Sequence, residues 1–277
     1  MSISWHKHLC EYYKVTPEEA LQLGTRSSGR KPNLPGSETC KEVSGMTYED
    51  IWALSKRETV EDVFKFYKDQ GAWSTFRQCV RHIELEQLHL SLLNSMSQAG
   101  GIFNNSHFCE YGAGVAPFAT TLLKNLPSKD VNLTISIVDV DCEHLNFAKY
   151  RLNSIVKELD LKNINLEFYT VEPESLPTFT KKIDALICFE VLEHVPSPVE
   201  VIKNISKSMR PGSIYVENFI KHEVEEDEDS GPDLLSARNE RSKYYDHVES
   251  MFNLIFPDVS YSNENPNCTR VWQRNSI

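Results

Sequence analysis

The sequence predicts an α/β fold: a mostly parallel sheet with helices on both faces and a helical N-terminal cap. Residues 107–217 alternate short apolar runs of strand length with amphipathic segments of helix length. That alternation requires right-handed crossovers and a parallel sheet. Residues 1–100 have helical and irregular patterns instead. We therefore divide the chain into a helical N-terminal cap and substrate region, 1–100, and an α/β domain, 101–277, with a lid-like insertion near 218–245.

Composition and charge limit the class of protein. The chain has 277 residues, of which 40% are hydrophobic, and this suits one large domain with an added cap. No apolar run is long enough to span a membrane, and the first residues lack the apolar core of a signal peptide. Seven scattered cysteines without a C-x-x-C pair indicate a reduced, cytoplasmic protein. The net charge of −11 argues against a nucleic-acid partner bound through its phosphates.

Capping residues predict the helices of the N-terminal region. Thr16 is the expected N-cap of a short helix that Gly24 ends, and Thr47 and Thr59 each precede an acid by three residues, as in a capping box. The segment 24–45 is rich in Gly, Ser and Pro and is expected to be a loop. The predicted helices are 17–23, 48–57, 60–69 and a long amphipathic helix that follows Gly71 and ends near Gly100.

Apolar runs and turns predict the elements of the α/β region. The runs are short and almost uninterrupted, as expected for parallel strands that are buried on both faces. The predicted strands are 108–110, 133–139, 166–171, 185–189 and 213–217, and the predicted helices are 117–126, 143–158 and 199–209.

Acidic residues follow four successive strands, and a glycine turn follows the first. Glu110, Gly112 and Gly114 form a strand end and a tight turn before a helix that starts at Pro117. Asp139, Glu172 and Glu190 end or follow the next three strands. Because the carboxyl ends of parallel strands meet at one crevice, backbone N–H groups and carboxylates are expected to face a nucleotide-like ligand there. The alternative is a domain of this kind whose acids only cap helices.

These residues resemble a known family. Glu110-x-Gly112-x-Gly114, Asp139, the segment 189–198 (Phe-Glu-Val-Leu-Glu-His-Val-Pro-Ser-Pro) and the turn 209–212 (Met-Arg-Pro-Gly) are similar to motifs of the class I S-adenosylmethionine-dependent methyltransferases. The resemblance covers residues 105–217 and implies their Rossmann-like sheet. Ala116 and Ser213 replace glycines of the family pattern by other small residues.

The resemblance also implies roles for individual residues in binding S-adenosyl-L-methionine. Glu110 and Gly112 are expected beside its methionine part, with Gly114 in the same turn. Asp139 is expected to bind the ribose, Val140 to pack nearby and Glu172 to meet the adenine. Phe189 and Glu190 are expected to flank the sulfonium. The residues with these implied roles are Glu110, Gly112, Gly114, Asp139, Val140, Glu172, Phe189 and Glu190.

A metal beside the acceptor is a second hypothesis, and a metal-free site is favoured over it. Glu190, Glu193 and His194 would share one face if their segment were helical, and two carboxylates with an imidazole suit a divalent ion. His247 or His222 is a candidate for a further ligand. Without a metal, Glu193 and His194 would form local hydrogen bonds, and His194 or His222 would be the candidate general base.

Two segments are expected to close over the site, 24–46 and 218–245, the second of which carries an acidic run. Trp73, Phe76 and Arg77 are candidates for contact with a ligand, against the simpler expectation that the two aromatic residues belong to the core. His82 and His89 are more simply explained as ordinary core or surface residues than as ligand contacts.

The resulting hypothesis is a methyltransferase for a small-molecule acceptor, with O- or N-methylation favoured. Neither the identity of the acceptor nor the oligomeric state follows from the sequence. The alternatives are a metal-dependent enzyme that acts on a nucleic-acid end, a nicotinamide-dependent oxidoreductase and a non-catalytic cofactor-binding module. The segment 190–198 argues against the oxidoreductase.

Overall fold

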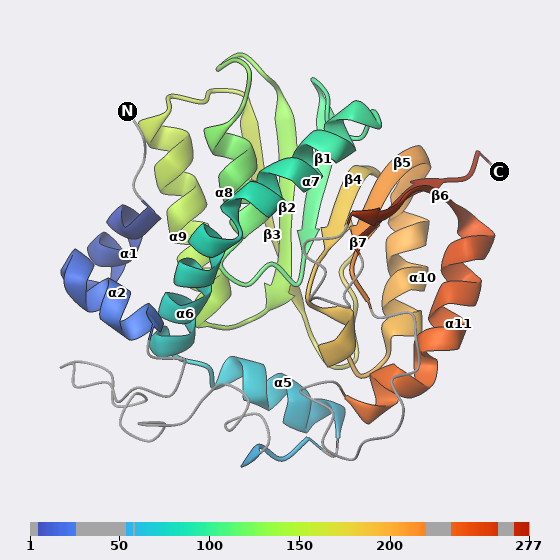
Figure 1. The fold of residues 1–277 in the computed structure, drawn as a ribbon, viewed down its shortest axis with the longest axis horizontal. Helices are drawn as coiled ribbons and strands as arrows, with labels where there is room; N and C mark the ends of the chain where they lie inside the picture. Colours follow the sequence, from blue (N-terminus) through green and yellow to red (C-terminus); the bar gives the residue numbers. More distant parts are fainter. Residues whose placement is uncertain (1–4, 26–53, 58, 220–233, 260–268, 277) are drawn as a thin grey trace.

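A seven-stranded sheet forms the centre of the computed structural model, which describes residues 5–25, 54–57, 59–219, 234–259 and 269–276. The strand order is β3-β2-β1-β4-β5-β7-β6 (Figure 1). The strands are β1 (Ser106–Tyr111), β2 (Leu133–Val140), β3 (Ile164–Val171), β4 (Ile183–Cys188), β5 (Met209–Glu217), β6 (Phe252–Val259) and β7 (Thr269–Arg274). The helices are α1 (Trp5–Tyr13), α2 (Pro17–Thr25), α5 (Val60–Lys68), α6 (Ala72–Glu84), α7 (Glu86–Gln98), α8 (Pro117–Lys124), α9 (Glu143–Glu158), α10 (Pro198–Ser208) and α11 (Leu235–Met251).

The five neighbouring strands β3, β2, β1, β4 and β5 are parallel to one another. The strand β7 lies between β5 and β6 and pairs antiparallel with both. The central strand β1 is buried along its whole length, as is β4 beside it. The change of strand order between β1 and β4 places a crevice at the carboxyl ends of these two strands. The predicted α/β fold with a mostly parallel sheet is confirmed, and β1 to β5 and α8 to α10 lie within a few residues of the predicted bounds.

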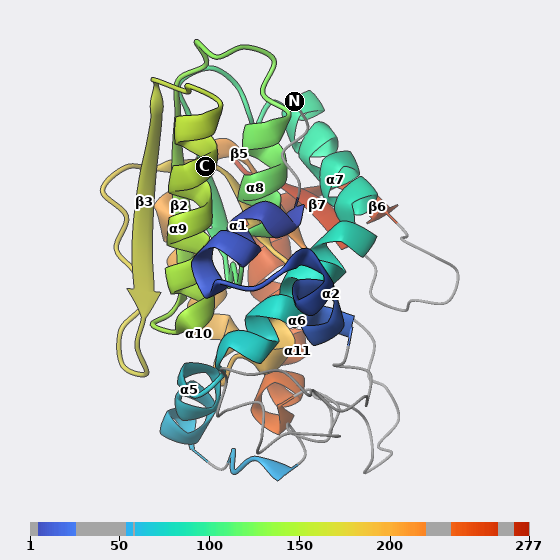
Figure 2. The same cartoon turned by 90° about the vertical axis from the view of Figure 1, so that its left-hand side faces the viewer.

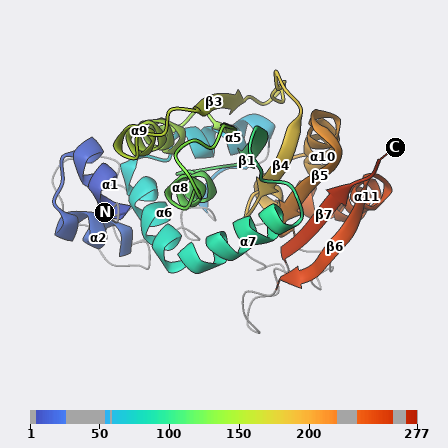
Figure 3. The same ribbon diagram turned by 90° about the horizontal axis from the view of Figure 1, so that it is seen from above.

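Helices cover both faces of the sheet (Figure 3). On one face, α7, α8 and α9 form an apolar cluster with alternate residues of the strands, among them Phe108, Ile135 and Ile187. On the other face, α10 and α11 pack against the intervening residues, among them Cys109 and Leu186. The period-two alternation of the strands therefore divides the apolar interior into two layers.

The N-terminal helices pack directly on the α/β elements. A third apolar cluster joins Leu9 of α1, Ala20 of α2 and Phe76 of α6 to Phe147 of α9. The helix α7 packs on α8. The helix α5 lies beyond the carboxyl ends of the strands, where it faces the crevice (Figures 1 and 2). Its capping box forms as expected, because the Thr59 hydroxyl accepts from the Asp62 N–H and the Asp62 carboxylate accepts from the Thr59 N–H.

The single long helix expected after Gly71 is wrong, because the chain changes direction at Leu85. Leu85 ends α6 and precedes α7, and its N–H donates to the carbonyl groups of Arg81 and Ile83. The break lets α6 pack on α9 while α7 packs on α8. Gly24 does not end α2, which continues to Thr25. A Cβ on Gly24 would lie 2.2 Å from Val80 Cγ2, so glycine is needed there for the close approach of α2 to α6.

Several predicted segments fall outside the described residues. They include most of the helix expected at 48–57, most of the loop 24–46 and the part 220–233 of the insertion. Residues 235–245 form the first part of α11, which packs on α10. In the part of the chain that the structure describes, no helix is long and apolar enough to cross a membrane.

We predict that Leu92→Ala destabilises the whole protein in one cooperative transition. Leu92 of α7 is fully buried in the same apolar cluster as Phe108, so its truncation leaves a cavity that costs about 2–5 kcal/mol. Thermal unfolding followed by circular dichroism measures the change, with Leu254→Ala at a 43% exposed position as the control. Two separate transitions, with only the weaker one shifted, would show that the N-terminal helices form an independent unit.

Candidate functional site

A pocket of about 620 Å³ opens at the carboxyl ends of β1 to β4. The helices α5 and α6 form the wall that faces the strand ends. All eight residues expected to bind the cofactor line this pocket, which are Glu110, Gly112, Gly114, Asp139, Val140, Glu172, Phe189 and Glu190. The parallel topology therefore brings these residues to one cavity, although Glu110 and Glu190 are 80 residues apart in the sequence.

The turn after β1 requires small residues in left-handed conformations. Gly112 has a φ of 66° and Gly114 a φ of 51°. A Cβ on Gly112 would lie 2.3 Å from Val191 Cγ2, so the backbone approaches its neighbour too closely for any side chain. Ala116, which replaces a glycine of the family pattern, has a φ of 54°, so the local conformation is left-handed there too.

Glu110 caps the helix that follows the turn. The helix α8 starts at Pro117, which has no N–H group, and no side chain of its own N-cap residue forms a hydrogen bond. The N–H groups of Phe118 and Ala119 donate instead to the two carboxylate oxygens of Glu110, at 3.1 and 2.8 Å. Burial raises the pKa of this carboxyl, which is 3% exposed, to about 8. Glu110 therefore caps α8 and also lines the pocket.

Asp139 connects the end of β2 to the glycine turn. One carboxylate oxygen accepts from the Gly114 N–H, and the other accepts from the Val140 N–H at 2.7 Å. Burial raises the pKa of Asp139 to about 6. Since a carboxylate has about four acceptor positions, the Asp139 side chain retains acceptor capacity toward the pocket.

Glu172 and Phe189 lie on different walls of the pocket. Glu172 follows β3 and forms an ion pair with Lys68 of α5 at 3.0 Å, where both side chains are more than a third exposed. Phe189 follows β4, and its ring lies 5.6 Å from the ring of Phe118 in an edge-to-face contact. The ion pair thus connects α5 to the strand ends, although an exposed pair of this kind adds little stability.

Glu190 has contacts with the residue that follows β5 and with α6. Its N–H donates to Asn218 Oδ1 at 2.7 Å, and Asn218 Nδ2 donates to Glu190 Oε1 at 2.6 Å. Its second carboxylate oxygen lies 3.3 Å from the Arg81 guanidinium of α6. The backbone of Glu190 is left-handed, with a φ of 57°.

Glu190, Glu193 and His194 do not share the face of an α-helix. Because Glu190 is left-handed and only Leu192–His194 forms a short 3-10 helix, the segment is not an α-helix. His194 lines the pocket, whereas Glu193 does not, and His194 Nε2 lies 3.9 Å from Glu193 Oε1.

His247, one of the two further metal candidates, does not join these residues. His247 lies on α11, outside the pocket lining, with its Nε2 3.0 Å from the Ser206 hydroxyl of α10. His222 lies outside the described residues. Among the residues that the structure does describe, no group of three or more His, Cys, Asp and Glu side chains is placed to bind a metal ion.

The helix α6 supplies polar side chains to the pocket. Arg77 lines it as proposed, but Trp73 and Phe76 do not, and Phe76 is a core residue at 2% exposure. Gln78 lies beside the glycine turn, where its Oε1 accepts from the Val115 N–H at 3.1 Å. Nothing in the sequence pattern singles out Gln78, because its contact depends on how α6 packs.

Two buried histidines, His82 and His89, line the pocket and belong to the core as well. The Arg151 guanidinium lies 3.2 Å from His82 Nδ1, which leaves His82 Nε2 to donate to the Thr121 hydroxyl at 3.1 Å. Burial lowers the pKa of His82 well below its usual value and that of His89 to about 4. Both imidazoles are therefore neutral near pH 7.

His144 is a pocket residue that the sequence analysis missed. It lies in the first turn of α9, and burial lowers its pKa to about 4. Its Nδ1 lies 3.4 Å from Gln78 Nε2, and its buried Nε2 has no hydrogen-bond partner among the described residues. The signal available in the sequence was its place five residues after Asp139, at the start of the helix that leaves the same strand end.

We predict that Glu110 makes stability depend on pH. The folded state keeps the proton up to about pH 8, whereas the unfolded carboxyl releases it near 4.5. Between the unfolded pKa and the folded pKa, the folded state therefore binds more protons than the unfolded state. The protonated Glu110 stabilises the fold fully below the unfolded pKa, and this stabilisation is lost as pH rises through the folded pKa. In Glu110→Gln, which resembles the protonated acid, this loss is absent.

Urea denaturation of wild type and Glu110→Gln between about pH 5 and 9 measures the effect. As pH rises over this range, the unfolding free energy of the wild type should fall relative to that of Glu110→Gln by on the order of 2–5 kcal/mol. A difference that stays constant with pH would contradict the raised pKa.

Comparison with known proteins agrees with this geometry. A family model described as a methyltransferase domain matches residues 102–254, more than half of the 277 residues. A curated relative, the ubiquinone biosynthesis O-methyltransferase of Coxiella burnetii, is 25% identical over 107 residues. That alignment covers 38% of this chain and only 40% of the relative, so the chain spans less than half the length of the curated relatives it matches.

Solved methyltransferase structures are similar in outline. A putative O-methyltransferase from Klebsiella pneumoniae is 11% identical, with a TM-score of 0.48, and the match covers 97% of this chain and 95% of that one. An O-methyltransferase family 2 protein from Planctomyces limnophilus, solved with apigenin, is 10% identical, with a TM-score of 0.40 and coverage of 71% and 62%. The family model, the parallel sheet and the pocket at its carboxyl ends together place the chain among the class I S-adenosylmethionine-dependent methyltransferases.

Proposed function

We propose that the enzyme transfers a methyl group to an oxygen or nitrogen atom of a small-molecule acceptor. The observation that supports this most is the pocket of about 620 Å³, which α5 and α6 wall off opposite the strand ends. A volume of this size is typical of small-molecule sites. Apolar side chains of α5, of the start of α8 and of the end of β4 line it, namely Val60, Val63, Phe64, Phe118 and Phe189. The proposed location is the cytoplasm, in line with the free cysteines among the described residues.

The residues present fit S-adenosylmethionine. The turn at Gly112 leaves no room for a Cβ and brings backbone close to the cavity. In the proposed arrangement, Asp139 accepts from ribose hydroxyls with the acceptor capacity that its two backbone bonds leave. Glu110 and Gly112 lie beside the methionine part, Glu172 near the adenine, and Phe189 and Glu190 beside the sulfonium.

S-adenosylmethionine supplies a methyl group that its sulfonium activates toward in-line displacement. The chain's own contribution is to orient the acceptor and exclude water, and alignment of this kind is worth several kcal/mol. His194 lines the pocket and is the proposed base for a proton on the acceptor atom, with His222 as the alternative outside the described residues.

The charge and the comparisons favour a small molecule over a nucleic-acid end. A net charge of −11 opposes contact with phosphates. The match to an enzyme named for ubiquinone biosynthesis supports an oxygen acceptor, although it extends over only 38% of this chain. An acceptor screen with small metabolites and short RNA separates the two classes.

We predict that Gly112→Ala weakens S-adenosylmethionine binding at least tenfold in calorimetry. The new methyl group would meet Val191 at a residue with a φ of 66°, so the turn must shift. Gly100→Ala is the matched control, because Gly100 has a φ of 82° but open space around its Cβ position. Undiminished binding in Gly112→Ala would sink the assignment of the turn to the cofactor.

We predict that turnover survives EDTA and that His194→Gln lowers kcat by about 100-fold. The residues Glu190, Glu193 and His194 do not share a face, which favours a base over a metal ligand. Initial rates with the acceptor found in the screen measure both effects, with S-adenosylhomocysteine affinity as the check on folding. Loss of activity in EDTA that a divalent ion restores would favour the metal-dependent alternative.

A further inference from the structure

Asn218 binds the backbone and the side chain of Glu190 at the same time. Its Oδ1 accepts from the Glu190 N–H at 2.7 Å, and its Nδ2 donates to Glu190 Oε1 at 2.6 Å. The two bonds use both ends of one amide and form a closed ring with the glutamate. Asn218 itself is 3% exposed and does not line the pocket, so any effect on a ligand passes through Glu190.

The conformation of Glu190 needs such a restraint. Its φ of 57° is left-handed, a conformation that is unfavourable for a residue with a side chain. Its carboxylate is also partly exposed to the pocket, at 30% of the side-chain surface, where a free side chain would sample several rotamers. The Asn218 amide opposes both kinds of freedom, because it fixes the N–H and one carboxylate oxygen together.

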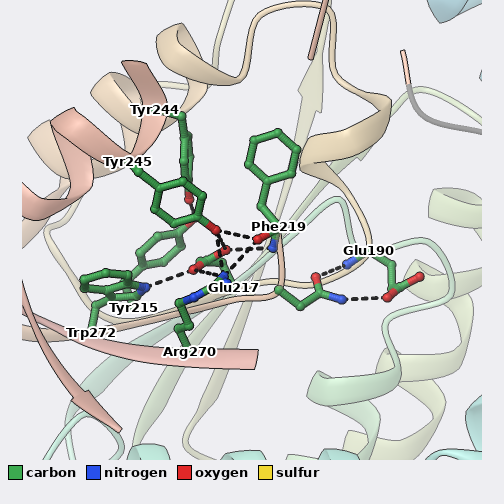
Figure 4. Close-up of polar contacts among 9 residues, drawn as sticks. Glu190, Tyr215, Glu217, Phe219, Tyr244, Tyr245, Arg270 and Trp272 are labelled. Atoms are coloured by element: carbon green, nitrogen blue, oxygen red, sulfur yellow. Dashed lines mark hydrogen bonds and ion pairs between the residues drawn. The ribbon is translucent and has the colours of Figure 1, made fainter. Parts of the chain in front are cut away.

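The residue before Asn218 is anchored by a buried network (Figure 4). The Glu217 carboxylate is fully buried at the end of β5. One of its oxygens accepts from the Trp272 indole at 3.0 Å and lies 3.4 Å from the Arg270 guanidinium. The other accepts from the Phe219 N–H at 2.7 Å and lies 3.2 Å from the Tyr245 hydroxyl.

The residue after Asn218 is anchored by the same network. The Phe219 carbonyl accepts from the Arg270 guanidinium at 2.8 Å and from the Tyr245 hydroxyl. Arg270 also donates to the Tyr245 hydroxyl at 2.7 Å. Asn218 is therefore fixed from both sides by side chains of β7 and α11 and projects from a rigid strand end.

We propose that Asn218 is a positioning residue that aims the Glu190 carboxylate at the place where the methyl group is transferred. The inference rests on the proposed function, which places Glu190 beside the sulfonium. A carboxylate fixed there favours positive charge on the group in front of it. The substrate chemistry that fits is an acceptor that presents an N–H or O–H donor to Glu190 while its lone pair faces the methyl group.

The test compares two ligands by calorimetry. S-adenosylhomocysteine lacks the methyl group, whereas sinefungin carries an ammonium-bearing carbon in place of the methylated sulfonium. The ratio of their dissociation constants isolates what Glu190 contributes at that point. Glu190→Gln should lower the preference for sinefungin about tenfold, as expected for loss of a charged hydrogen bond. Asn218→Ala should lower it at least about threefold and change S-adenosylhomocysteine affinity less than about twofold.

The double variant shows whether Asn218 acts through Glu190. Combined with Glu190→Gln, Asn218→Ala should change the ratio no further, because the carboxylate that it orients is gone. An additive effect overturns the proposal. So does an unchanged ratio in Asn218→Ala, or an equal loss of affinity for both ligands, which would indicate a purely structural role.

Two further measurements keep these outcomes apart. Asn204→Ala is the matched control. Asn204 of α10 donates to the Pro177 carbonyl at 3.2 Å, and neither residue lines the pocket. Loss of this side chain should leave the ratio of dissociation constants unchanged. Asn218→Ser replaces Asn218→Ala if the latter does not fold, with the same expectation, because a hydroxyl is too short to bridge both groups. Wild type that binds neither ligand contradicts the proposed function itself, and the inference with it.

Discussion

The capping of α8 by Glu110 is the contact on which the geometry of the pocket depends. The N-cap residue of this helix is Ala116, whose methyl group cannot accept a hydrogen bond. The carboxylate at the end of β1 supplies the missing acceptor and accepts from two backbone N–H groups. The turn between them, with Gly112 and Gly114, is thereby fixed at both ends, and its left-handed conformation is maintained.

Polar side chains at the neighbouring strand ends bind loop backbone in the same way as Glu110. Asp139 ties β2 to the same turn, and Asn218 ties β5 to Glu190 at the end of β4. In each case a polar side chain at a strand end satisfies the backbone of the adjacent loop. The crevice is therefore organised by hydrogen bonds within the protein, and a ligand meets groups whose positions are already determined.

Local patterns were sufficient for the parallel strands β1 to β5 and for the residues at their ends, but α1, α11, β6 and β7 were not predicted. Apolar runs gave β1 to β5 because buried parallel strands need them, and the carboxyl ends of such strands converge by topology. The break at Leu85 did not follow from the pattern, because apolar spacing continues through it and only packing on α8 and α9 requires it. The spacing at 190–194 would bring Glu190, Glu193 and His194 to one face only in a helix, and a spacing alone does not reveal that Glu190 is left-handed.

Gln78 and Asn218 could not be identified from the sequence because their partners are distant in the chain, and His144 was marked only by its place five residues after Asp139. The central claim is that the carboxyl ends of β1, β2 and β4 bind the cofactor. A crystal structure with S-adenosylhomocysteine tests it most directly. The account predicts the ribose hydroxyls on Asp139 and the sulfur beside Phe189 and Glu190. A ligand bound elsewhere, with Asp139 in contact only with Gly114 and Val140, would contradict it.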